Sequence, residues 1–107
     1  MKIAVTATGG SMSALVSEKF GRCQYFLVVD SDTMKFEPVS NSGMDMAGGA
    51  GPAAARQIAD LGAKVILTGA VGPNAARALE GAGIKVVSGF AGDQTVREAV
   101  EKYIQKG

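Results

Sequence analysis

Two glycine-rich turns, Gly48–Pro52 and Gly69–Asn74, constrain the fold of this chain more than any other feature. Each contains a proline and runs into a stretch with helical spacing of apolar residues. Glycine allows positive φ and the close approach of another group, and proline suits the first helical position, where its missing N–H has no helical partner. Helix starts of this kind leave backbone N–H groups that attract anions. The turns therefore predict a binder of a small, negatively charged ligand.

The order of strands and helices follows from the apolar pattern on both sides of these turns. Short apolar or β-branched runs predict strands, and spacings of three and four residues predict helices. Pro38 places the third strand at a sheet edge, and Thr95 and Glu98 have capping-box spacing before a last helix with an apolar stripe. The expected strands are Lys2–Ala7, Tyr25–Asp30, Lys35–Ser40, Lys64–Thr68 and Ile84–Ser88, and the expected earlier helices are Pro52–Leu61 and Pro73–Ala82.

This order predicts an α/β fold with a mixed five-stranded sheet. The first strands are joined by short turns and are expected to pair antiparallel, whereas the strand–helix–strand units of the second half favour parallel crossovers with helices on the faces of the sheet. A chain of 107 residues fits one domain, 1–107, with a core of its own.

Composition and charge exclude several classes of function. The net charge is +1 and no run of lysines and arginines forms a stripe, so the sequence predicts no nucleic-acid partner. The N-terminal apolar stretch is too short for a signal peptide or a membrane span, which predicts a cytoplasmic protein without membrane contact. The single cysteine excludes an intrachain disulfide, and the absence of histidine removes much familiar catalytic chemistry.

Three motifs in order, Val16–Phe26, Gly48–Pro52 and Thr68–Ala75, resemble the dinitrogenase iron–molybdenum cofactor biosynthesis family, the NifX-like and NifB C-terminal-like domains. The resemblance covers nearly the whole chain. It implies a three-layer ribonuclease-H-like fold without nuclease activity, and a role in carrying or assembling metal–sulfur clusters between donor and acceptor proteins. It also implies a relative in this fold group that holds a molybdenum–copper sulfide cluster without covalent bonds.

The chain departs from this family at one position. Members commonly carry His-Phe-Gly-Arg where this sequence has Lys19-Phe20-Gly21-Arg22. A protonated lysine cannot ligate a metal as an imidazole does. A metal–sulfide cluster that brings its own bridging ligands is usually anionic, however, so Lys19, Arg22 and the helix starts are expected to hold it electrostatically.

The residues expected to bind the cluster lie in the loops at the strand ends, because ligands of α/β sheets commonly bind in the crevice formed there. The glycines among them have a purely structural alternative in tight turns and close packing, and the two cations are equally compatible with solvated surface positions. The expected binding residues are Thr8, Gly9, Gly10, Lys19, Arg22, Gly48, Gly49, Gly51, Gly69, Gly72 and Asn74.

Three sulfur-bearing side chains are candidate metal ligands: Cys23, Met44 and Met46. Positive charge beside Cys23 is expected to lower its pKa and favour a thiolate, and thioethers favour soft metals, so these residues and Met12 would form a sulfur-rich mouth. The alternative is that the cysteine is a small buried residue and the methionines only fill space.

The sequence favours a non-enzymatic carrier or scaffold over a catalyst. Asp30 has no evident acidic partner for a nuclease-type Mg²⁺ site, and neither common nucleotide-binding glycine motif occurs. The expected cargo is an iron–molybdenum, iron–sulfur or molybdenum–copper cluster or its precursor. A module for nucleotides or other phosphate ligands and a regulatory protein-interaction domain remain the alternatives, and the oligomeric state is left open.

Overall fold

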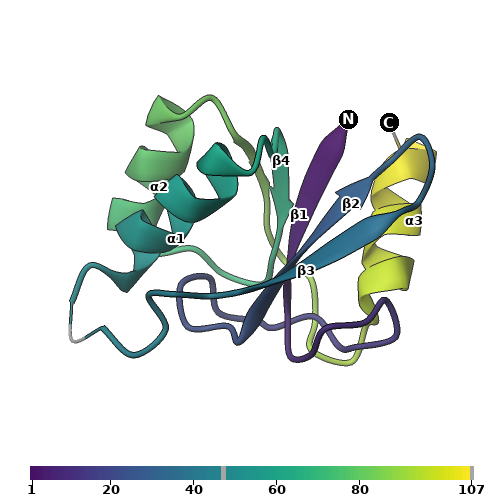
Figure 1. Ribbon diagram of the computed structural model, residues 1–107, viewed down its shortest axis with the longest axis horizontal. Helices are drawn as coiled ribbons and strands as arrows, with labels where there is room; N and C mark the ends of the chain where they lie inside the picture. Colours follow the sequence, from purple (N-terminus) through teal and green to yellow (C-terminus); the bar gives the residue numbers. More distant parts are fainter. Residues whose placement is uncertain (47, 107) are drawn as a thin grey trace.

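The computed structural model describes residues 1–46 and 48–106 (Figure 1). Among these residues, three strands come first, and helices then alternate with two further strands to give five strands and three helices. The strands are β1 Lys2–Ala7, β2 Tyr25–Asp30, β3 Phe36–Ser40, β4 Val65–Leu67 and β5 Lys85–Val87, and the helices are α1 Ala50–Asp60, α2 Pro73–Gly81 and α3 Val96–Lys106.

The strands form one mixed sheet in the order β3-β2-β1-β4-β5. β1 pairs antiparallel with β2, which pairs antiparallel with β3, whereas β4 is parallel to both β1 and β5. This confirms the predicted change from antiparallel to parallel pairing. Pro38 lies on β3 at one edge of the sheet, where a missing N–H leaves no ladder bond unmade.

The helices cover both faces of the sheet, as predicted. Alternate residues of β1 point to opposite faces, so Ile3 and Val5 pack with α3 while Ala4 packs with α1 and α2. In Figure 1, α1 and α2 lie side by side on one face and α3 covers the other. Two buried clusters result, and the central strands β1 and β4 contribute to both.

Most predicted element bounds differ from the structure by a residue or two, but α1 shows an informative difference. The sequence predicted a helix from Pro52, whereas α1 begins at Ala50 and its N-cap residue Gly49 has φ 76°. Pro52 is therefore the third helical residue, a position where proline is tolerated because its N–H would have no partner within the helix. Pro73 opens α2, as predicted.

The last helix has the predicted cap. The backbone N–H of Thr95 donates to Glu98 Oε1 at 2.8 Å, and the N–H of Glu98 donates to Thr95 Oγ1 at 3.1 Å. These two bonds form a capping box. Within the described ranges, no helix is both long enough and apolar enough to cross a membrane.

Candidate functional site

A short segment of the motif Val16–Phe26 crosses the carboxyl end of β4. Phe20 N–H donates to the carbonyl of Ala70 at 3.1 Å, and Ala70 N–H donates to the carbonyl of Glu18 at 2.7 Å. A Cβ on Gly69 would lie 2.5 Å from that Glu18 oxygen. Gly69 is therefore a packing glycine, since only its missing side chain lets the two backbones meet.

The same segment then packs against the start of α1. Gly21 has φ +91°, and a Cβ there would lie 3.1 Å from both the nitrogen and the Cα of Gly51. A Cβ on Gly51 would in turn lie 2.7 Å from the Cβ of Ala75 in α2. Small residues at these contacts bring the starts of α1 and α2 together under the Phe20–Arg22 segment.

A cavity of about 270 Å³ opens between these parts. Five of the residues predicted from sequence line it: Arg22, Gly49, Gly51, Gly72 and Asn74. Sequence reasoning missed the other lining residues, which are Phe20, Ala50, Pro52, Pro73 and Ala75. Apolar and proline residues carry no chemical signal of a site, although Phe20 and the two prolines lie within the motifs that indicated one.

Residues at the starts of both helices line this cavity. Among the described residues, the N–H groups of Ala50, Gly51, Asn74 and Ala75 have no hydrogen-bond acceptor. Neither helix has a side-chain cap or an acidic residue in its first turn. No lining residue is acidic. The partial positive charge of the two helix ends is therefore not compensated by these residues, and an anionic ligand could compensate it.

Gly72 leaves space that the fold itself does not require. Its φ of −71° suits any residue, and a Cβ placed on it would meet no described atom within 4 Å. A larger side chain there would reduce the open space beside the α2 amides. Gly48 is equally free of neighbours but does not line the cavity.

Arg22 is the positively charged side chain of the cavity lining. Its Nη1 donates to the carbonyls of Met44 and Met46, both at 2.7 Å. Those two bonds hold the guanidinium at the rim of the cavity and fix the backbone on both sides of Asp45. Lys19 is exposed, pairs through its backbone with Ala70 and does not line the cavity. Lys19, at the position where the sequence resemblance implies a histidine, thus lies outside the lining.

The expectation that the pKa of Cys23 is lowered is wrong. The side chain is only 1% exposed and packs in the core beneath α1 and α2. Burial raises the pKa of the Cys23 thiol to about 11, and weaker hydrogen bonds, one of them from Asn41, lower it only in part. The exposed Arg22 therefore does not produce a thiolate, because desolvation of the sulfur is the larger effect.

The expected sulfur-rich mouth does not form either. Met12 is buried in the α3 cluster, on the face of the sheet opposite Cys23. Met46 is 42% exposed and Met44 is half-buried, and neither lines the cavity. In the part of the chain that the structure describes, no group of three or more His, Cys, Asp and Glu side chains is placed to hold a metal ion.

The loop Thr8–Gly10 also lies apart from the cavity, although the sequence predicted that it converges with the glycine turns. Thr8 is bonded through its N–H and its hydroxyl to the carbonyl of Leu15. A Cβ on Gly10 would touch the Pro38 ring. The loop leads directly into Met12 in the α3 cluster, so the end of β1 turns toward the face opposite the α1 and α2 starts.

Asn41 is a positioning residue that the sequence did not reveal. Its buried Nδ2 donates to the carbonyls of Gly21 and Cys23, both at 3.0 Å. The N–H of Gly43 donates to its Oδ1 at 3.0 Å. One amide side chain thus fastens the segment around Arg22 to the loop after β3. An isolated asparagine at a strand end gives no signal of such a role.

Two solved structures of other proteins are similar to this one. The apo form of the orange protein from Desulfovibrio gigas is similar in structure, with a TM-score of 0.94 and 45% identity over 98% of this chain and 88% of that chain. A NifB-like protein from Thermotoga, solved by NMR, matches with a TM-score of 0.83 and 33% identity over 97% and 87% of the two chains. A search of curated proteins found no match.

The sequence profile described as dinitrogenase iron–molybdenum cofactor matches residues 1–106. That match spans all three motifs and every residue that lines the cavity. This chain belongs to the dinitrogenase iron–molybdenum cofactor family.

Proposed function

We propose that this protein carries a metal–sulfur cluster, or a precursor of one, as an anion in the cavity between the starts of α1 and α2. One observation carries the proposal: two helix starts line a single cavity, and four of their backbone N–H groups have no acceptor among the described residues. Family membership supplies the class of cargo, since the family is described by a metal–sulfur cofactor.

The donors around the cavity suit an anion with its own bridging sulfides. Hydrogen bonds to a charged group each contribute about 1.5–3 kcal/mol. The guanidinium of Arg22 adds a positive charge to the cavity lining. The absence of an acidic residue from the lining avoids repulsion of such a ligand.

The same geometry favours electrostatic capture over coordination by the protein. A neutral Cys23 thiol in the core is a poor ligand, because metals bind the thiolate. Among the described residues, the lining consists of backbone groups, one arginine, one asparagine and apolar side chains. The Asn74 Oδ1 already accepts a bond from Arg77 at 2.6 Å. A cluster with a complete set of its own ligands fits these residues better than a bare metal ion does.

This proposal includes the finer expectations that the sequence raised. The protein passes its cargo between donor and acceptor proteins and acts as a carrier without catalysis. Its fold is of the ribonuclease-H-like type, and the order β3-β2-β1-β4-β5 with helices on both faces supports that assignment. Analysis of the bound metal distinguishes an iron–molybdenum, an iron–sulfur and a molybdenum–copper cluster.

A phosphate ligand is the competing occupant, because helix N-termini bind phosphate by the same donors. The test is to incubate the oxygen-free protein with cluster precursors in one arm and with ATP or inorganic phosphate in another. We expect stoichiometric metal and acid-labile sulfide with a band in the visible spectrum. Retention of nucleotide without retention of metal or sulfide would overturn the carrier proposal and make the helix starts a phosphate site.

A Cys23→Ala variant tests the mode of binding in the same assay. Electrostatic capture predicts that the variant retains the cluster, and that both proteins lose it as salt rises, because the interaction is screened. The free energy of unfolding is expected to fall by about 1 kcal/mol because a small buried group is lost. A well-folded Cys23→Ala protein that no longer retains any cluster would instead establish coordination by the thiolate.

A further inference from the structure

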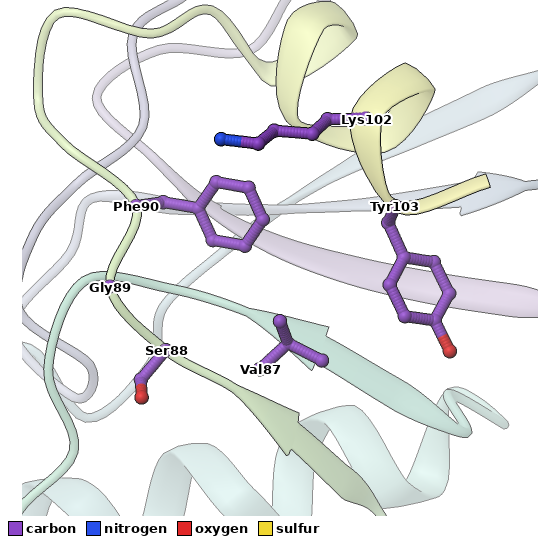
Figure 2. A pocket seen from close by; sticks show the side chains of 6 residues that line it. All are labelled: Val87, Ser88, Gly89, Phe90, Lys102 and Tyr103. Carbon is purple, nitrogen blue, oxygen red and sulfur yellow. The ribbon is translucent and has the colours of Figure 1, made fainter. Parts of the chain in front are cut away.

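The cavity between the starts of α1 and α2 is called the anion cavity below. A second surface lies on the opposite face of the sheet, and it is formed where the edge strand β5 meets α3. A pocket of about 130 Å³ opens there. Figure 2 shows Val87 at its floor with the rings of Phe90 and Tyr103 on either side and the side chain of Lys102 extending across from α3 toward Phe90. An apolar cavity of roughly 150 Å³ accommodates benzene, so this pocket has room for one apolar side chain.

The backbone beside this pocket is open to pairing. Lys85 N–H donates to the carbonyl of Lys64, and the carbonyl of Val87 accepts from Thr68 N–H, so residues 85 and 87 face β4. Val86 between them therefore directs its N–H and C=O away from the sheet, because these groups alternate along a strand. β5 is the last strand in the sheet order. An extended segment can add to such an edge and place alternate side chains in pockets.

Two lysines give this edge a charge. Lys85 Nζ lies 5.7 Å from the centre of the Tyr103 ring, and Lys102 lines the pocket directly. Among the side chains that the structure describes, those of residues 1–46 and 48–105, the one ion pair joins the N-terminus to Asp32, so neither lysine is paired with a carboxylate there. Glu98, one turn before Lys102, accepts the N–H of Thr95 in the helix cap.

We propose that the edge of β5 and this pocket dock an extended acidic segment of a partner protein, with one apolar side chain of that segment between Val87, Phe90 and Tyr103. Carboxylates of the segment pair with Lys85 and Lys102. A second copy of this chain is a poorer occupant, since two β5 edges would bring the same lysines together, and like charges on facing strands are destabilising. Lysine at an edge also opposes pairing with uncharged strands, which makes the edge selective.

This proposal extends beyond the anion cavity and is tested without any cluster. A display library of random twelve-residue peptides is selected on the wild-type protein. We expect the enriched peptides to combine carboxylates with at least one apolar residue. Their binding should weaken at least tenfold in Lys102→Glu and in Lys85→Glu. The matched control is Lys35→Glu, the same charge change beside the other edge strand, which should change affinity by less than twofold.

Amide NMR signals locate the bound peptides. We expect shifts at Val86 and Ser88 on β5, and unchanged signals at Gly72 and Asn74 in the anion cavity. Peptides without carboxylates, equal binding by Lys102→Glu, or shifts confined to the cavity would overturn the proposal. A wild-type dimer in sedimentation experiments, with the Val86 amide protected from solvent exchange, would assign this edge to a second copy and would overturn it as well.

Discussion

The three helices of this protein begin in two different ways. At α3, Thr95 and Glu98 cap each other, and the N–H groups of Val96 and Arg97 donate to the carbonyls of Ala14 and Met12. At α1 and α2 the N-cap residues are Gly49 and Gly72, which offer no side-chain cap. The start of α3 is satisfied within the protein, whereas the starts of α1 and α2 line a cavity and have N–H groups without an acceptor among the described residues.

The difference suggests a binding role for the uncapped starts of α1 and α2. A side-chain cap typically contributes about 1 kcal/mol to stability, and this chain uses one where the helix start lies away from the cavity. Where two starts share a cavity, it has glycines in place of caps and no acidic residue in either first turn. Helix N-termini bind anions, so the placement of two uncapped starts at one cavity favours an anionic ligand as their partner.

The largest loss of stability is expected from Gly69→Ala, which disrupts the backbone contact between Gly69 and Glu18 beside the starts of α1 and α2. Its Cβ would lie within 2.9 Å of three backbone atoms of Glu18. Backbone atoms cannot rotate aside, so we expect the free energy of unfolding to fall by about 2–3 kcal/mol in urea titrations. Gly72→Ala is the matched control, because a Cβ there has no neighbour, and it should remain within about 1 kcal/mol of wild type.

Equal destabilisation by the two alanines would show that the distinction between packing and open glycines is wrong.

Gly72→Asp is expected to have the next largest effect, because it makes the start of α2 resemble that of α3. The carboxylate would accept the unpaired N–H groups of α2 and repel an anion. We expect cluster retention to weaken by about 2 kcal/mol, roughly thirtyfold, while thermal stability stays equal or rises. Anaerobic loading followed by metal and sulfide analysis measures the first quantity, and calorimetry measures the second.

Gly72→Asn separates charge from hydrogen bonding in this experiment. Asparagine caps the helix as well as aspartate does but brings no charge, so its effect on retention should be smaller. Undiminished cluster binding by Gly72→Asp would place the cargo somewhere other than this cavity.

The smallest expected effect is on stability, and it concerns how the capping box at the start of α3 responds to pH. Hydrogen bonds from the Thr95 backbone and then from its side chain hold the pKa of Glu98 below its usual range. The stabilisation by the ionised carboxylate is therefore complete above the ordinary pKa of glutamate and is lost as pH falls through the lowered value. Glu98→Gln keeps the capping geometry without this titration.

We expect the stability advantage of wild type over Glu98→Gln to shrink as the pH is lowered in parallel urea titrations. A difference that stays constant from neutral to acidic pH would show that the charge of Glu98 contributes nothing.

The fold could be predicted well because its signals are local. Lys2–Ala7 and Tyr25–Asp30 are strands with the predicted bounds, and the Thr95–Glu98 cap forms as its spacing indicated. The start of α1 was the weaker prediction. Proline is acceptable anywhere in a first turn, so Pro52 alone does not say which of three residues begins the helix.

The site was predicted only in part, because side-chain chemistry depends on burial. The motif residues Arg22, Gly51 and Gly72 do meet at one cavity. Cys23 follows a cation in the sequence, but the fold places its sulfur in the core, where desolvation outweighs that charge. Position beside a charged residue cannot reveal this, since the direction of a side chain is settled by packing.

The sequence by itself determined the order of the elements, the change from antiparallel to parallel pairing and the glycine starts of two helices, because these depend on neighbouring residues and on hydrophobic period. Only the tertiary structure decided which glycines serve packing and which leave open space. It also turned the end of β1 and Met12 toward α3, away from the cavity. Such outcomes depend on contacts between residues far apart in the chain, as between Gly69 and Glu18, and no local pattern encodes them.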